Sequence, residues 1–150
     1  MIHYQQITKE DVGSVIRLLL VMHEESPAYS GLEPDYDFTH NLCLNIIENN
    51  QFGELAFDDN MLVGLMLGHA GNIPFTKSLA AYEFVLYVHP NYRGKIGLKL
   101  LHSFEDWAIE KGITYVFLGV SADINSAMVN QMYRKLGYEE SGNNFRKFLN

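Results

Sequence analysis

The sequence predicts an α/β protein with a central mixed, mostly antiparallel sheet of about seven strands, flanked by about four helices. The strongest evidence is the segment Ala80–Gly112, which passes from an apolar strand through a short glycine turn into an amphipathic helix. Two apolar runs separated by Asp58-Asp59-Asn60 indicate an antiparallel hairpin. A second buried strand at 114–120 follows the helix, so it should lie parallel to strand 80–88 through a right-handed crossover.

The first third of the chain predicts one strand and two helices. Ile2–Ile7 alternates as a strand, and Thr8 can cap the helix that follows, whose apolar spacing continues to about His23. Segment Ser26–Asp37 contains two prolines, a glycine and two tyrosines, which is typical of a turn-rich loop. A second helix is expected from about Asp37 to Asn49.

The middle of the chain predicts the hairpin and the central strand–helix unit. The hairpin strands are expected at 52–57 and 61–69, and β-branched and aromatic residues mark the strand at 80–88. From Ile96 the apolar residues take helical spacing, and Gly112 ends that helix.

The last part of the chain predicts a strand, a helix and a hairpin. The strand at 114–120 is followed by a helix that begins after Asn125 and ends at Gly137. Two short strands at 138–141 and 145–149 are expected to close the chain as a short hairpin.

Composition and charge limit the classes of partner. With 150 residues, 47% of them apolar, the chain is long enough to bury the core of one domain over 1–150 and too short for two. Eleven basic against eighteen acidic residues give a net charge of −7, which argues against nucleic acid and suits a cationic small molecule or a basic peptide. An acidic surface that only maintains solubility explains the same charge.

The sequence favours a cytoplasmic protein without membrane attachment. Lys9 and Glu10 lie where a signal peptide needs an apolar run, and no apolar stretch approaches the roughly 18 residues of a membrane span. Cys43 is the single cysteine and can form neither an internal disulfide nor a metal cluster. We therefore expect a reducing compartment and no metal site.

The turn Arg93-Gly94-Lys95-Ile96-Gly97 predicts an anion site. Its glycines allow a tight turn and a close approach to a ligand, and the first N–H groups of the following helix carry a partial positive charge. Arg93 and Lys95 add full charges, so phosphate groups are the natural ligand. An ordinary strand-to-helix turn with solvated basic residues is the alternative.

The chain resembles the GNAT superfamily of acetyl-CoA-dependent N-acetyltransferases over essentially its whole length. The first motif is LYVHPNYRGKIGLKLL, which is similar to the family pattern of Arg or Gln, two variable residues, Gly, one variable residue, and Gly or Ala. The second is YRKLGYEE, where Tyr133 on the late helix precedes Gly137-Tyr138. The turn is one residue shorter than usual, and Asn125 lies eight residues before Tyr133, one more than is common.

The resemblance implies a GNAT-like fold and places the cofactor, acetyl-CoA. Main-chain groups of Leu86, Tyr87 and Val88 would pair with the pantetheine arm of CoA as an added strand does, and Asn125 would also contact the cofactor. Tyr133 would lie near the thioester sulfur as general acid. Backbone N–H groups of the turn would hold the pyrophosphate, and these belong to Arg93, Gly94, Lys95, Ile96, Gly97 and Leu98.

The implied reaction moves the acetyl group directly to a primary amine, with no enzyme nucleophile. The amine must first lose a proton, because a lysine-like amine has a pKa of about 10.4. Glu83 is the candidate base, since it is the only charge in its strand, should share a face with Tyr87, and would have a raised pKa if buried. A structural carboxylate paired with a neighbour is the alternative.

The binding site for the amine acceptor is expected near the end of the first helix and the loop after it. Glu25, Tyr29 and Tyr36 would offer a carboxylate and aromatic faces to a small cationic amine or a protein amine. His69 would border the acceptor, and with His89 it could relay protons. A merely solvated helix end explains the charges equally well.

Three rival interpretations remain open at this point. The first is a different acyl donor or acceptor on the same fold, and the second is a catalytically inactive GNAT-like module that binds CoA or a protein partner. A dinucleotide-binding domain is weaker, because no G-x-G-x-x-G follows the first strand. A homodimer is compatible with each of them.

Overall fold

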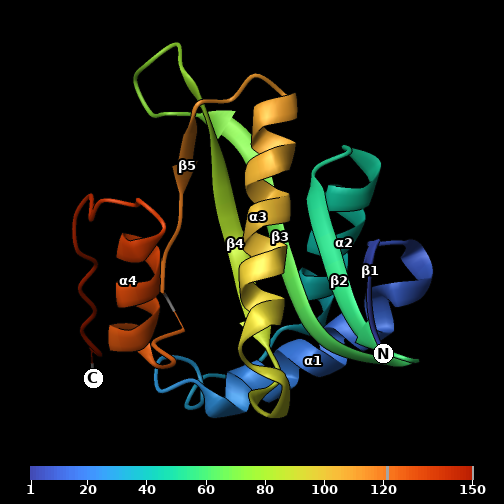
Figure 1. Cartoon of the computed structure of the whole chain (residues 1–150). Coiled ribbons are helices and arrows are strands. Elements are labelled where there is room, and N and C mark those ends of the chain that lie inside the picture. The colour runs from blue at the N-terminus through green and yellow to red at the C-terminus, as the bar shows by residue number, and fades with distance from the viewer. Residues whose placement is uncertain (121, 150) are drawn as a thin grey trace.

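A five-stranded sheet with helices on both faces forms the centre of the computed structural model, which describes residues 1–120 and 122–149 (Figure 1). The strands are β1 (Ile2–Gln6), β2 (Phe52–Asp58), β3 (Met61–Asn72), β4 (Leu79–Val88) and β5 (Tyr115–Phe117). They lie in the sheet in chain order. The first three neighbouring pairs are antiparallel and β4 pairs with β5 in parallel, so the predicted mixed, mostly antiparallel sheet is confirmed.

The expected count of about seven strands is wrong, because the described residues 138–149 contain no strand. β5 is also shorter than the strand expected at 114–120. A two-stranded ribbon is marginal in water unless another layer covers it. Here Phe145, Phe148 and Leu149 are more than four-fifths exposed, so nothing in the described chain covers such a ribbon.

The described part of the chain confirms the expected number of helices, about four. They are α1 (Val12–Glu25), α2 (Tyr36–Glu48), α3 (Lys95–Glu110) and α4 (Ser126–Lys135), with single 3-10 turns at Lys9–Asp11 and Pro90–Tyr92. Gly112 and Gly137 follow α3 and α4 with φ angles of 74° and 93°, which are conformations that favour glycine at a helix end. Within the described chain, none of the helices has the length and apolar character that crossing a bilayer requires.

The sheet separates two hydrophobic cores. α3 covers one face and packs there through Leu100 and Phe104, while α1 and α2 cover the other face through Val15 and Ile46 (Figure 1). Gly68 of β3 allows α3 to approach closely, because a Cβ atom at this position would lie 2.5 Å from Cε1 of Phe104. The apolar spacing of each helix therefore matches the face that it buries.

A β-bulge at Phe84 changes which side chains of β4 share a face. Leu67 pairs with Val85 and Gly68 pairs with Glu83, so Phe84 is left without a partner. Glu83 consequently faces the α3 side with Gly68, whereas Tyr87 belongs to the core beneath α1 and α2. The expectation that Glu83 and Tyr87 share a face is wrong, because it assumed uninterrupted alternation.

Candidate active site

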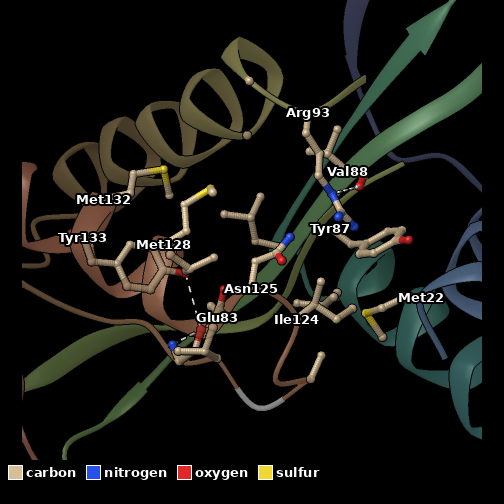
Figure 2. A pocket seen from close by; sticks show the side chains of 18 of the residues that line it. Met22, Glu83, Tyr87, Val88, Arg93, Ile124, Asn125, Met128, Met132 and Tyr133 are labelled. Carbon is tan, nitrogen blue, oxygen red and sulfur yellow. Dashed lines mark hydrogen bonds between the residues drawn. The ribbon is translucent and has the colours of Figure 1, made fainter. Parts of the chain in front are cut away.

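The site lies where β4 and β5 separate. Their pairing ends at Tyr82 with Phe117, while β4 continues to Val88 with no partner on that side among residues 1–120 and 122–149. A cavity of about 290 Å³ opens there between β4, the start of α3, the residues after β5, α4 and the end of α1 (Figure 2). An unpaired strand edge inside a cavity offers main-chain donors and acceptors to an extended ligand.

Glu83 and Tyr133 meet in this cavity at Gly119. A carboxylate oxygen of Glu83 accepts a 2.6 Å hydrogen bond from the Gly119 amide. The Tyr133 hydroxyl donates to the Gly119 carbonyl oxygen at 3.4 Å (Figure 2). Tyr133 is buried at 9% exposure and projects from α4, so the two ionisable groups reach the same residue from two different elements, β4 and α4.

Burial sets the protonation states of this pair. Desolvation raises the pKa of Glu83 to about 7, although the Gly119 hydrogen bond opposes that change. Burial, with the charge of Glu83 as a smaller cause, raises the pKa of the Tyr133 hydroxyl well above its usual value. Near neutral pH, Glu83 can therefore accept a proton while Tyr133 keeps its own.

The turn before α3 has the shape expected of an anion site. Gly94 takes a φ of 134° at the N-cap of α3, and both Gly94 and Gly97 line the cavity. A Cβ atom at Gly97 would meet only Val88, at 3.7 Å, so this side of the turn is open. Amides of the first helical turn have no partner within the helix and are available to an anion.

The side chains of three other predicted turn residues do not line the cavity. Ile96 is 7% exposed and packs into the core under α3. Lys95 and Leu98 are not among the side chains that line the cavity.

Arg93 uses its side chain to join β4 to α1. Its Nε donates to the Val88 carbonyl oxygen at 3.1 Å, and Nη2 forms a 2.6 Å ion pair with Glu25. The guanidinium also lies 5.5 Å from the centre of the Tyr87 ring, and the Tyr87 hydroxyl donates to the same Glu25 oxygen. The hydrogen bond from Arg93 is the main cause that lowers the pKa of Glu25.

The structure brings together most of the predicted side chains and, besides Lys95, Ile96 and Leu98, it separates three others. Leu86, Tyr87, Val88, Asn125 and Tyr29 line the cavity with the residues above, and Figure 2 shows the Asn125 side chain directed into it. Glu25 lies behind this wall in its ion pair. Two predicted side chains lie away from it: Tyr36, which is 55% exposed at the start of α2, and His69, whose ring stacks on Phe84 at 4.4 Å.

A family model for the acetyltransferase (GNAT) family matches residues 18–138 of the sequence. The chain belongs to the GNAT acetyltransferase family. The resemblance inferred from the two motifs is thereby confirmed, as is the prediction of an acetyl-CoA-dependent N-acetyltransferase. A comparison with curated proteins finds no match.

Solved structures show the same fold as this GNAT protein. An aminoglycoside acetyltransferase from an uncultured soil metagenomic sample, in complex with trehalose, has a TM-score of 0.74 at 23% identity, covering 99% of this chain and 97% of that one. A predicted acetyltransferase from Clostridium acetobutylicum, solved with acetyl-CoA, has a TM-score of 0.75 at 19% identity, covering 99% and 96%. The aminoglycoside N-acetyltransferase AAC(6')-Iy, in complex with a bisubstrate analogue, has a TM-score of 0.76 at 15% identity, covering 100% and 99%.

Two features of this GNAT protein's site fit acetyl-CoA. The unpaired edge of β4 can pair with an extended arm, and the glycine turn at Gly94 and Gly97 leaves room for a diphosphate beside unpaired amides. The carbonyl of Val88 is the exception, because it already accepts from Arg93.

Several cavity residues of this GNAT protein were not predicted from the sequence. Gly119 holds both ionisable side chains through its backbone, and nothing in its sequence neighbourhood marks that role. Methionines from two helices also form the wall, namely Met22, Met128 and Met132. Their helical spacing indicated only core packing, since a methionine that lines a cavity looks the same in a sequence.

Proposed function

We propose that this GNAT protein transfers the acetyl group of acetyl-CoA directly to a primary amine, in a single domain. One observation carries the proposal most strongly: Glu83 and Tyr133 meet at Gly119 inside a cavity bordered by an unpaired strand edge and a helix N-terminus. This arrangement supplies a base, an acid and an anion site within one cavity.

The binding roles follow from the open edge of β4 and the first turn of α3. Leu86, Tyr87 and Val88 would pair with the pantetheine arm along the open edge of β4, with Asn125 contacting it from the opposite wall. Amides from Gly94 to Leu98 would hold the diphosphate at the start of α3. Arg93 would act as a positioning residue for this turn, because its side chain is committed to Glu25 and Val88.

The proton transfers follow from the two protonation states. Acetyl-CoA supplies an activated acetyl group as a thioester. Glu83 would take the proton that the substrate ammonium loses, directly or through water, so that the amine nitrogen can form its bond to the acetyl carbon. Tyr133 would donate a proton to the sulfur as the carbon–sulfur bond breaks, and CoA would leave as a thiol. The nitrogen would lose its second proton as the amide forms, and that proton would restore the hydroxyl of Tyr133.

The acceptor we propose is a small-molecule or peptide amine. The aminoglycoside acetyltransferases of similar fold support an amine acceptor of the small-molecule class. The net charge of −7 supports a cation as the approaching substrate, since a field of this sign attracts ammonium groups.

Three measurements test the proposal. Calorimetry should show acetyl-CoA binding to the wild type, and a thiol assay should show CoA release that depends on an added primary amine. Mass spectrometry of the product should show an added acetyl group on that amine. Binding without amine-dependent release would instead support an inactive CoA-binding module, and no binding would overturn the proposal altogether.

A further inference from the structure

The cavity reaches from one face of the sheet to the other. Its two ends are therefore lined by different residues. Leu86 and Val88 belong to the core under α3, whereas Val85 and Tyr87 lie with the core under α1 and α2. All four line the cavity, because none of the described residues pairs with β4 here on the side of β5. One end therefore opens beside the glycine turn and the other beside α1.

The end beside α1 has apolar and aromatic walls. Met22 and Tyr29 come from α1 and the loop after it, Val85 comes from β4, and Ile124 comes from the segment before α4. Figure 2 shows Met22 and Ile124 beside Tyr87, on the opposite side of the cavity from Met132 and Tyr133. A ligand group placed at this end would contact carbon and sulfur atoms over most of its surface.

Few charged groups line the cavity, and one of them is already paired. Glu83 and Arg93 are the only charged side chains among the described residues that line the cavity. Arg93 is neutralised by Glu25, whose carboxylate also accepts from Tyr87. A single carboxylate, that of Glu83, is thus left to receive an ammonium.

We propose that the acceptor is a monoamine carried on an apolar or aromatic body, and that polycationic amines are poor substrates. This inference rests on the proposed function and specifies its acceptor. A monoamine would place its one ammonium group at Glu83 and bury its apolar body against Met22, Tyr29 and Ile124. A polycation would bring further ammonium groups into an apolar wall without partners, which is costly.

Acidic residues outside the cavity do not change the inference that the acceptor is a monoamine. Glu24, Glu33 and Asp37 follow one another along the same part of the chain, and all are exposed. None of them lines the cavity. Their field would attract any amine toward the entrance, and the walls inside would then select among amines.

The first experiment compares amines on the wild-type protein. The thiol assay would measure kcat/KM for 2-phenylethylamine, spermidine and kanamycin at one pH and ionic strength. We expect 2-phenylethylamine to be preferred by about tenfold or more, because its ring becomes buried. A preference for spermidine or kanamycin would overturn this inference and leave the proposed function intact, whereas release with none of the amines would count against both.

The second experiment places a charge in the apolar wall. Met22→Glu should lower kcat/KM for 2-phenylethylamine by about tenfold or more, while the Kd for acetyl-CoA changes by less than about twofold. Val21→Glu is the matched control, since Val21 is the preceding residue, is 39% exposed and does not line the cavity. Equal kcat/KM values for the two variants, with both folded by circular dichroism, would overturn the inference.

Discussion

The carboxylate of Glu83 accepts a 2.6 Å hydrogen bond from the backbone amide of Gly119. This bond crosses the point where β4 and the segment after β5 separate, so it fixes the carboxylate at the mouth of the opening. The carbonyl oxygen of the same residue receives the hydroxyl of Tyr133. The backbone N–H and C=O groups of Gly119 therefore set the distance between the proposed base and the proposed acid.

Tyr133→Phe should lower kcat by about a hundredfold and leave the Kd for acetyl-CoA nearly unchanged. The hydroxyl is the only group removed, and its 3.4 Å bond to Gly119 is too long to contribute much to stability. Tyr138→Phe is the matched control, because its ring lies beside that of Tyr133 while its hydroxyl donates to Glu105. Full activity of Tyr133→Phe would remove this residue as the acid.

Glu83→Gln should remove one ionisation from the pH profile of kcat/KM. In the wild type we expect activity to rise with pH through an apparent pKa of about 7, because the carboxylate must be ionised to accept a proton. Glutamine retains the size of the side chain and the bond from the Gly119 amide. If the variant kept the wild-type profile between pH 5.5 and 8.5, the ionisation would belong to another group.

The same variant should be more stable than the wild type at alkaline pH. The pKa of Glu83 is raised on folding, so the folded protein binds this proton more tightly and wild-type stability falls as pH rises from about 4.5 to about 7. Glu83→Gln avoids that loss, and its free energy of unfolding at pH 8 should exceed that of the wild type by about 1–3 kcal/mol. Urea unfolding at pH 5 and pH 8 measures the difference, and an equal effect at both values would contradict the assignment.

Local patterns in the sequence predicted the elements well, and the strand–turn–helix motif is present where they placed it, whereas the anion site at its turn stays a prediction. They failed where the geometry depends on contacts between distant segments. The bulge at Phe84 is set by pairing with β3, and strict alternation along β4 therefore put Glu83 on the wrong face. Gly119 was missed because its role is carried by backbone atoms, which every residue has.

For the C-terminal segment, local patterns predicted strands that the described residues do not form. Alternation and the Gly142-Asn143-Asn144 turn favoured a hairpin, because local propensity was the only information available. A strand also needs a neighbour, and β5 forms only three paired positions. Pairing partners and covering layers are tertiary properties that a local pattern does not contain.

Gly97→Glu should weaken acetyl-CoA binding by about tenfold or more. The glycine borders the cavity at the first turn of α3, so the new side chain would place bulk and negative charge where a diphosphate is expected. Gly13→Glu is the control, since Gly13 is an exposed glycine near the start of α1. Calorimetry measures both Kd values, and an unchanged Kd for Gly97→Glu would show that the diphosphate binds elsewhere.

Glu25→Gln should uncouple the turn before α3 from the end of α1. The ion pair with Arg93 is 2.6 Å long with both side chains about 30% exposed, so its loss should cost about 1 kcal/mol of stability at pH 7. Because Arg93 lowers the pKa of Glu25 in the folded protein, this stabilisation is present above about pH 4.5, the unfolded value, and is lost as pH falls through the folded pKa. The difference in unfolding free energy between wild type and variant should therefore shrink below pH 4.5. Glu24→Gln makes the same charge change on an exposed neighbour, and an equal pH dependence in that control would mean that net charge, rather than the Arg93 contact, is responsible.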